Sequence, residues 1–298
     1  MKITFRQLQV FDAAATLGSV VRAAEKIGMS QSAASIALRD LQIVLQYPLF
    51  NHVKGQSLKL TKEGHRLKPL IRSLLTMANY VENYPEDVMQ GTLLVGATDL
   101  IGETILPEIC ASFMKLYPSV KIKIQMGGFG EVLTSLQRME LDTALFEYSP
   151  DDPEIELISW RTEELWLVAA PDHPLAGRRD LKISDLAHVS WCARDAKSST
   201  SLRLKAMFSI NQQPASIEAA SDHAVRLATI AGAGIACLSS GLIEADIVAG
   251  KLVKLDVEGF KFPRTLSLAR PKGVWRSPLV KAFDAFLLER GTVPPVKP

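Results

Sequence analysis

Three short amphipathic segments open the chain, and their boundaries carry residues suited to helix ends. Gly18 ends the first segment, while Ser19 and Ser30 stand where a hydroxyl can accept a free first-turn N–H group of the segment that follows. The apolar periodicity predicts helices over residues 5–15, 20–27 and 31–45. Helices joined by such tight turns indicate a helix-turn-helix.

The third predicted helix has one apolar side and one mostly polar side. The apolar stripe consists of Ala34, Leu38, Leu41 and Leu45. The opposite side carries Gln31, Ser32, Ser35, Ile36 and Arg39. The polar members can hydrogen-bond base edges or phosphates. Two interpretations stay open at this point: a DNA-reading face, or the solvated face of a small helical bundle.

The pattern changes over residues 46–61, where the stretch from Asn51 to Lys59 is polar. Pro48 breaks the third helix, Leu49 and Phe50 are expected to enter the core, and Gly55 marks a turn between two short strands. Thr61 then caps a long helix over residues 62–84, about 34 Å in length, with Pro69 as an expected kink or restart.

An apolar stripe with heptad spacing follows this long helix. Its members are Leu67, Ile71, Leu74, Ala78 and Val81. An amphipathic helix packed on its own domain would show a similar stripe. The length of the helix and the narrowness of the stripe favour dimerisation through it.

The rest of the chain follows a hinge expected at residues 85–91 and alternates between strand and helix patterns. Strands are predicted at 92–97, 120–126, 143–146, 165–170 and 235–238, and helices at 102–116, 131–138 and 224–231. Such alternation indicates an α/β fold with parallel sheets. This segment is too long for one small α/β unit, so two subdomains are expected.

Composition narrows the class of protein. The 298 residues are 47% hydrophobic and 22% charged, as in ordinary globular domains. No apolar run of about 18 residues predicts a membrane helix, and the polar start lacks the apolar core of a signal peptide. Three widely spaced cysteines argue against a disulfide framework and for a reducing cytoplasm.

Charge is unevenly distributed along the chain. Residues 1–88 hold 11 Lys and Arg against 7 Asp and Glu, whereas residues 89–298 hold 23 against 25. A basic N-terminal segment on a slightly acidic body is a mild indication of nucleic acid at that end.

A set of residues spread over nearly the whole chain has the spacing of one known family. In the N-terminal part it comprises Gly18-Ser19, Ala23-Ala24, Ser30 to Ser35, Leu38, Leu41, Pro48-Leu49-Phe50, Leu60-Thr61 and Glu63-Gly64. In the body it comprises Gly91-Thr92-Leu93, Leu106-Pro107, Phe113, Tyr117-Pro118 and Ala231 to Ile235. With these motifs the chain resembles the LysR-type transcriptional regulators. It looks closest to the branch related to regulators of sulfur assimilation and carbon fixation.

The resemblance implies an α/β protein with an N-terminal winged helix-turn-helix, a long linker helix and a two-subdomain effector domain like the periplasmic binding proteins. The expected divisions are residues 1–61 for DNA binding, 62–90 for the linker and 91–298 for the effector domain. Within the last, subdomain 1 takes 91–161 and 268–298, and subdomain 2 takes 162–267.

The function implied is that of a bacterial regulator in the cytoplasm, a homodimer or homotetramer that binds promoter DNA and senses a small molecule. Lys54 should lie on the wing near a phosphate. Three departures weaken the electrostatic grip on DNA: His52 and Asp40 stand where basic residues are frequent, and Ile36 where the family is often polar or basic. Ile36 could instead contact a thymine methyl group.

Candidate effector contacts lie where predicted strands give way to helices. Thr98 and Asp99 follow the first strand of the body, and Ser198, Ser199 and Thr200 precede a later helix. In the family, hydroxyls at corresponding positions face the cleft between subdomains, and His223 is a further cleft candidate. Helix capping alone would explain the same residue types. The carboxylate of Asp99 would disfavour a simple inorganic anion.

No cofactor or metal is expected from the motifs. The five histidines and three cysteines lack metal-ligand spacing. Gly232 and Gly234 stand between a helix and a strand, the reverse of a dinucleotide loop, and predict a helix end and turn. Because no nucleophile elbow or phosphate-binding loop is present, an enzyme is not expected. An enzyme or a stand-alone binding module using the α/β cleft remains the alternative.

Overall fold

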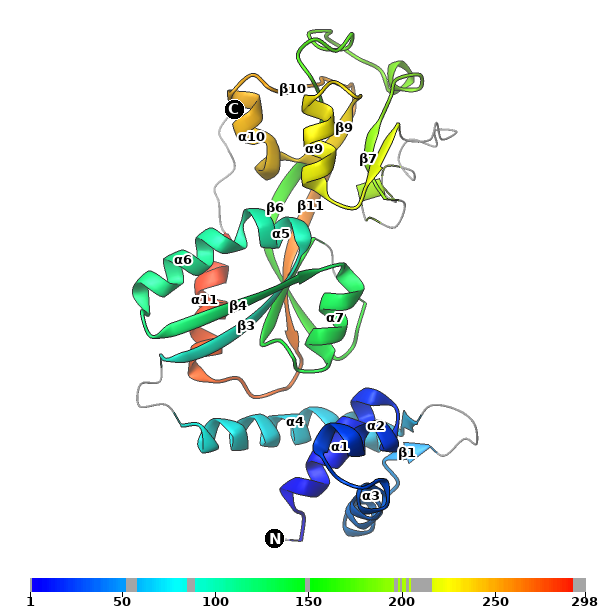
Figure 1. Ribbon diagram of the computed structural model, residues 1–298, viewed down its shortest axis with the longest axis vertical. Helices are drawn as coiled ribbons and strands as arrows, with labels where there is room; N and C mark the ends of the chain where they lie inside the picture. Colours follow the sequence, from blue (N-terminus) through cyan, green and yellow to red (C-terminus); the bar gives the residue numbers. More distant parts are fainter. Residues whose placement is uncertain are drawn as a thin grey trace.

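The computed structural model describes residues 2–51, 58–84, 89–147, 151–195, 198, 200–201, 204 and 216–291. A small helical domain stands at one end of the molecule, one long helix follows it, and an α/β domain makes up the rest (Figure 1). The long helix lies between the other two parts.

The N-terminal domain contains the helices expected from the sequence. These are α1 (Phe5–Leu17), α2 (Val20–Ile27) and α3 (Gln31–Leu45). Gly18 ends α1 in the left-handed conformation, with φ of 63°, which glycine adopts without strain. Ser19 and Ser30 cap α2 and α3 by accepting the N–H groups of Arg22 and Ala33. The predicted caps are thus confirmed.

A short antiparallel pair follows α3, as predicted, while the turn expected at Gly55 lies outside the described residues. Strand β1 (Phe50–Asn51) pairs with β2 (Lys59–Leu60), and Phe50 lies opposite Leu60. Leu49 and Phe50 are buried in the core, where the Phe50 ring lies 5.5 Å from the ring of Phe11. His52 and Lys54 lie outside the described residues, so their predicted roles stay predictions.

Helix α4 (Lys62–Glu82) continues through Pro69 without a break, whereas a kink or restart is expected at that residue. Thr61 caps it by accepting the N–H of Gly64. Arg72 is buried and fixes the helix on the N-terminal domain, because it donates to Asp12 at 2.8 Å and to Thr16 at 2.9 Å. The first half of α4 is therefore part of that domain's core.

One predicted seam residue is wrong for this reason. The side chain of Ile71 is only 4% exposed and packs with the N-terminal core. A side chain that its own domain already covers has almost no surface left to bury in a seam with a second chain. Leu67 also packs on this core, while Leu74 and Val81 are exposed.

The first half of the α/β domain is a sheet with helices on both faces. Its strands are ordered β4 (Val120–Gly127), β3 (Gly91–Thr98), β5 (Thr143–Phe146), β11 (Pro263–Pro271) and β6 (Ile155–Ala169). One face packs against α6 (Leu106–Leu116) and α11 (Pro278–Gly291), and the other against α7 (Phe129–Gln137). Figure 1 shows this arrangement.

The sheet is mixed, so the expectation of parallel sheets is only partly right. Strand β3 is parallel to β4 and β5, but β11 is antiparallel to both β5 and β6. The predicted helix 102–116 is also two helices, α5 (Asp99–Thr104) and α6. Pro107 occupies the first turn of α6, where its ring excludes a continuous helix from the preceding turn.

The second half of the α/β domain is built on the far end of β6. Residues 165–169 of that strand pair with β9 (Ala236–Ser239) and β10 (Val253–Lys254). The remaining elements are η1 (Ile183–Leu186), β7 (Cys192–Arg194), β8 (Ile217–Ala219), α9 (Asp222–Ile230) and α10 (Ser240–Val248). Strands β6 and β11 run between the halves, so the expected subdomain boundaries fall inside them. Gly232 follows α9 with a left-handed φ of 81°, as the predicted helix end requires.

No helix in the described part of the chain is long and apolar enough to cross a membrane.

Candidate DNA-binding face and effector cleft

The solvent side of α3 presents the side chains that the sequence predicts for DNA contact. Ala34, Leu38 and Leu41 face the core. The exposed side chains on the helix include Gln31, Ser32, Ser35, Ile36 and Arg39. Among these Ile36 is the large apolar one, half exposed at 49%, and therefore available for a methyl contact. The structure thus places all five predicted residues at the surface of one helix.

Arg39 lies beside Asp40, and the two form an ion pair with Nε and Oδ1 3.8 Å apart. Both side chains are exposed, so the pair contributes at most about 1 kcal/mol. The guanidinium can therefore exchange this carboxylate for a guanine edge or a phosphate at small cost.

A cleft of about 420 Å³ lies between the two halves of the α/β domain. Its walls include four predicted residues, Thr98, Asp99, Ser198 and Thr200. The same cleft is lined by residues that sequence reasoning missed, namely Gly127 to Gly130, Glu147, Arg194, Asp195, Asp222 and Arg264. The end of β3 and the start of α7 meet strands from the second half here.

Two arginines dominate the chemistry of this cleft, the buried Arg264 and the partly buried Arg194. Arg264, 5% exposed, is paired with Glu163, which also accepts the Ser239 hydroxyl at 2.7 Å. Arg194 is paired with Asp222. Arg264 Nη2 and Arg194 Nε are nevertheless buried without a hydrogen-bond partner among the described residues. Because an unpaired buried N–H is costly, these atoms are donors ready for an acceptor in the cleft.

Carboxylates line the same cleft as these donors. Burial raises the pKa of Glu147, although the charge of Arg264 opposes the rise. Asp99 is half-buried at the start of α5. The cleft therefore offers donors and acceptors together, which suits a ligand with both an acidic group and a hydroxyl or amino group.

The two hydroxyl clusters differ in how far capping uses them. Ser198 Oγ accepts the N–H of Ser201 at 3.1 Å and contacts its hydroxyl at 3.0 Å, so helix capping explains this serine in part. Thr98 stands at the N-cap position of α5 but makes no capping hydrogen bond. Its hydroxyl is the better placed of the two to bind a ligand.

His223 is outside the cleft lining, contrary to its predicted role. It lies on α9 with Nε2 3.5 Å from Oε2 of Glu103 on α5. Since α9 and α5 belong to different halves of the domain, this contact joins the two halves at the side of the cleft. His223 could therefore influence the cleft only indirectly, through its contact with Glu103.

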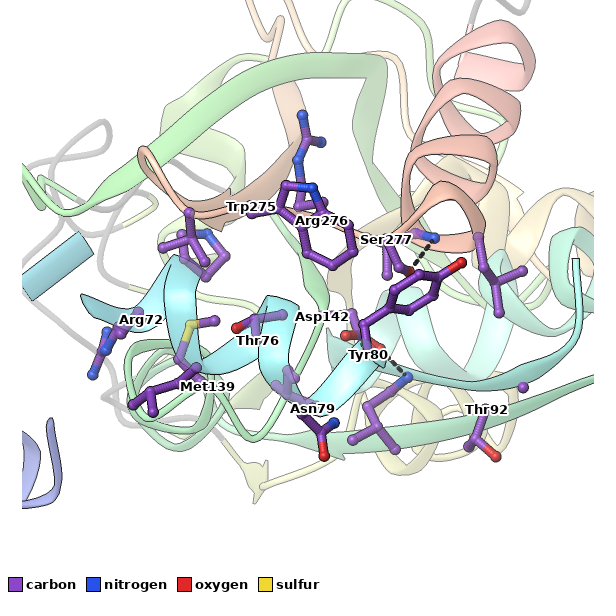
Figure 2. Close-up of a pocket in the computed structure, with 18 of the residues that line it drawn as sticks. Arg72, Thr76, Asn79, Tyr80, Thr92, Met139, Asp142, Trp275, Arg276 and Ser277 are labelled. Carbon is purple, nitrogen blue, oxygen red and sulfur yellow. Dashed lines mark hydrogen bonds between the residues drawn. The ribbon is translucent and has the colours of Figure 1, made fainter. Parts of the chain in front are cut away.

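A larger cavity of about 560 Å³ lies under α4 (Figure 2). Its charged groups already have partners: Arg72 is bound to Asp12, and Arg276 donates to Asp284 at 2.5 Å. Asp142 accepts the N–H of Leu94 at 2.8 Å, and burial raises the pKa of its carboxyl group. This cavity separates α4 from the sheet. The unpaired donors Arg264 Nη2 and Arg194 Nε line the smaller cleft instead, so we favour that cleft as the ligand site.

The cysteines are poor candidates for redox chemistry. Cys110, Cys192 and Cys237 are all buried and free. Burial raises the pKa of Cys110 and of Cys237 to about 12, so neither forms the reactive thiolate near neutral pH. Within the described residues no group of three or more His, Cys, Asp or Glu side chains could hold a metal ion.

Two family models match the chain. Residues 5–65 match the bacterial regulatory helix-turn-helix protein of the lysR family, and residues 86–292 match the LysR substrate binding domain. The chain belongs to the LysR family of bacterial transcriptional regulators. This LysR regulator is therefore a DNA-binding protein with an effector-binding domain, and not an enzyme.

Curated relatives cover almost the whole of this LysR regulator. It is 29% identical to the RuBisCO operon transcriptional regulator of Allochromatium vinosum over 97% of this chain and 96% of that one. It is 31% identical to CfxR of Cupriavidus necator, over 96% and 92% of the two chains. It is 29% identical to CysL of Bacillus subtilis, over 87% and 88%. The resemblance to carbon-fixation and sulfur regulators is thereby confirmed.

Solved structures share the fold. A full-length OxyR variant of Pseudomonas aeruginosa aligns with a TM-score of 0.64 at 17% identity, covering 96% of this chain and 94% of that one. CbnR complexed with its target DNA aligns at 0.56 and 20% identity, over 97% and 99%. The CcmR regulatory domain of Synechocystis PCC6803 in complex with 2-PG aligns at 0.63 and 22% identity, over 68% and 98%. The expected order of helix-turn-helix, long helix and α/β domain is confirmed.

Proposed function

We propose that this LysR regulator reads promoter DNA with the exposed face of α3, as a homo-oligomer joined through α4, and that a small molecule in the α/β cleft alters this binding. The observation that carries the proposal is the pair of buried, unpartnered arginine nitrogens in the cleft, as far as the described residues extend. A regulator of this kind acts on the chromosome, so we expect it in the cytoplasm. Footprinting on DNA that flanks its own reading frame, with and without candidate metabolites, tests the proposal.

Arg39 is the residue of α3 proposed to read a base. Arg39→Ala should weaken binding to the footprinted site by about 1–3 kcal/mol and change base preference there, if the guanidinium binds guanine through two hydrogen bonds. Binding titrations on the specific site and on random DNA measure both. Equal losses on the two DNAs would mean that Arg39 contacts only a phosphate.

Lys54 is predicted from the sequence to contact a phosphate. Lys54→Ala should therefore weaken binding to every DNA sequence alike, and the slope of log K against log salt concentration should become shallower by about one.

A second copy of the chain is the proposed partner of α4. The helix exposes an apolar stripe formed by Leu70, Leu74, Met77 and Val81, and Tyr84 continues its alternating steps of four and three residues just past the end of α4. These side chains are 43% to 70% exposed. An antiparallel pair of such helices would place Met77 opposite Met77 and Leu74 opposite Val81, a contact in which both chains use the same surface.

An apolar groove of about 300 Å³ continues this stripe onto the N-terminal domain. It is lined by Ile3, Phe5, Leu8, Leu41, Leu45, Leu67, Leu70, Ile71 and Leu74. Phe5 and Leu70 are exposed at its edge. In the proposed dimer the far end of the partner's α4 would cover this groove, which removes exposed apolar area from water.

The effector is proposed to carry an acidic group together with a hydroxyl or amino group. Arg264 Nη2 and Arg194 Nε supply donors for the acid, and Asp99 supplies an acceptor for the second group. A structural neighbour supports a small ligand in a domain of this fold, since the CcmR regulatory domain was solved in complex with 2-PG.

Three cleft variants test the effector site by calorimetric titration with a ligand that shifts the footprint. Thr98→Ala and Ser198→Ala should each weaken binding by about 0.5–1.5 kcal/mol, with the larger loss at Thr98. Asp99→Asn should also weaken it, because the second group loses a charged acceptor. Tighter binding by Asp99→Asn would indicate a bare anion instead. Unaltered affinity in all three variants would place the effector elsewhere.

A further inference from the structure

Helix α4 is held along one side by the α/β domain. Lys68 donates to Glu154 at 2.5 Å. Ser73 Oγ accepts the N–H of Trp275 at 2.9 Å, and its single hydrogen is shared between the carbonyls of Pro69 on α4 at 2.9 Å and of Gly273 at 3.2 Å. The contacts continue along the helix, where the ring of Tyr80 lies 5.3 Å from that of Trp275. We call these contacts the α4 clamp.

The clamp and the apolar stripe use different sides of the helix. At about 100° per residue, Leu70 lies in the middle of the exposed stripe. Ser73 and Tyr80 then lie about 60° and 80° to one side of it, and Lys68 lies about 160° away. The α/β domain can therefore hold α4 while the proposed second chain packs on it. The two surfaces are neighbours on one helix. A displacement of the clamp residues would therefore move α4 and change the packing at that dimer contact.

The residues that form the clamp stand at the ends of β6 and β11. Glu154 precedes β6, and Gly273 and Trp275 follow β11. The backbone pairing extends past the strand ends, since Lys272 N–H donates to Glu154 O at 2.8 Å. Further along the same two strands lie Glu163 and Arg264, which face each other in the register, and Arg264 lines the cleft.

Both ends of this strand pair are locked by an arginine and a glutamate in register. Arg264 binds Glu163 at the cleft end, and Arg270 binds Glu156 through two nitrogens at 2.8 and 3.0 Å at the α4 end. The seven residue steps from Arg264 to Pro271 span about 24 Å. A single irregularity in pairing occurs near Trp160, whose indole N–H is fixed to Leu287 O at 2.6 Å.

We propose that the paired strands β6 and β11 transmit the state of the cleft to α4 through the clamp. A hydrogen-bonded strand pair resists stretching and sliding, so a shift of Arg264 and Glu163 at the cleft is carried to Glu154 and to the loop at 272–277. The clamp then shifts the position of α4, and with it the helix-turn-helix that binds DNA and the stripe that packs on the second chain. This inference rests on the proposed function, in which the cleft is the effector site and α4 links DNA binding to a second chain.

Hydrogen exchange in the full-length protein tests the coupling without any effector. The cleft variant is Arg264→Gln with Glu163→Gln, which removes both charges and leaves neither unpaired. We expect amides of α4 from residue 68 to 82 to exchange at least about threefold faster, while those of α2 keep their rate. Ser239→Ala, which removes only one hydrogen bond to Glu163, should give a smaller change of the same kind and covers the case in which the double variant fails to fold. Unchanged exchange in α4 in a folded variant would overturn the proposal.

A mutant cycle on DNA affinity gives a second reading. The clamp variant is Glu154→Gln, and the matched control is Glu108→Gln, an exposed carboxylate on α6. With a DNA fragment from upstream of the protein's reading frame, the cleft and clamp variants together should depart from the product of their separate effects on Kd by at least about threefold. Multiplicative effects, or the same departure with the control, would contradict the proposal. Because the cycle uses no effector, its failure is distinct from a footprint that does not respond to metabolites.

Discussion

Replacing Leu74 with aspartate is expected to convert the N-terminal fragment, residues 1–84, from a dimer to a monomer. Leu74 is 49% exposed within the apolar stripe and also lines the apolar groove. An ionised carboxylate buried there against a second chain would cost several kcal/mol unless it found a partner. The fragment has its own hydrophobic core and lacks the α/β domain, so contacts between α/β domains cannot hide the effect. Sedimentation velocity measures the change.

A matched variant separates the stripe from the general effect of added charge. Asn79→Asp places the same carboxylate on an exposed position of α4 that faces the α/β domain in the full-length chain. This variant should remain a dimer and keep cooperative binding to paired half-sites, whereas Leu74→Asp should lose it. An unchanged sedimentation coefficient for Leu74→Asp would mean that the stripe has no partner chain.

The helices and their caps could be predicted because their signals are local. Gly18, Ser19, Ser30 and Thr61 act on backbone groups within one turn, and each lies where its spacing predicts. The proposed dimer stripe is harder to predict, since α4 also packs on the N-terminal core and contacts the α/β domain. Apolar periodicity alone cannot tell which positions the chain's own core occupies, so it assigns Ile71 to the seam although the N-terminal domain buries it.

In the cleft, too, the sequence predicts the residues that local patterns mark and not those placed by long-range contacts. Thr98, Asp99, Ser198 and Thr200 could be predicted because they stand at strand ends and helix starts. Arg264 could not, because its partner Glu163 is 101 residues away and an isolated basic residue is typical of an exposed position. The strand β11 that carries it pairs with β5 and β6 rather than with a neighbour in sequence, so local alternation gave no signal for it.

Truncating Ile71 to alanine should therefore affect stability and leave the dimer intact. Ile71 is 4% exposed among Leu41, Leu67 and other residues of the N-terminal core. Removing a buried isoleucine side chain leaves a cavity, and such changes cost about 2–5 kcal/mol in the free energy of unfolding. Urea unfolding of the fragment 1–84, at a fixed protein concentration, should show a lower midpoint with an unchanged slope.

The adjacent residue supplies the control for this prediction. Leu70 is 58% exposed on the proposed dimer stripe, so Leu70→Ala should change the unfolding midpoint far less when both fragments are dimeric. The dimer dissociation constant should move the other way: it should rise for Leu70→Ala and stay the same for Ile71→Ala. A higher dimer dissociation constant for Ile71→Ala, with an unchanged free energy of unfolding, would contradict this prediction. It would mean that Ile71 contacts the second chain and that α4 packs on the N-terminal core through its other side.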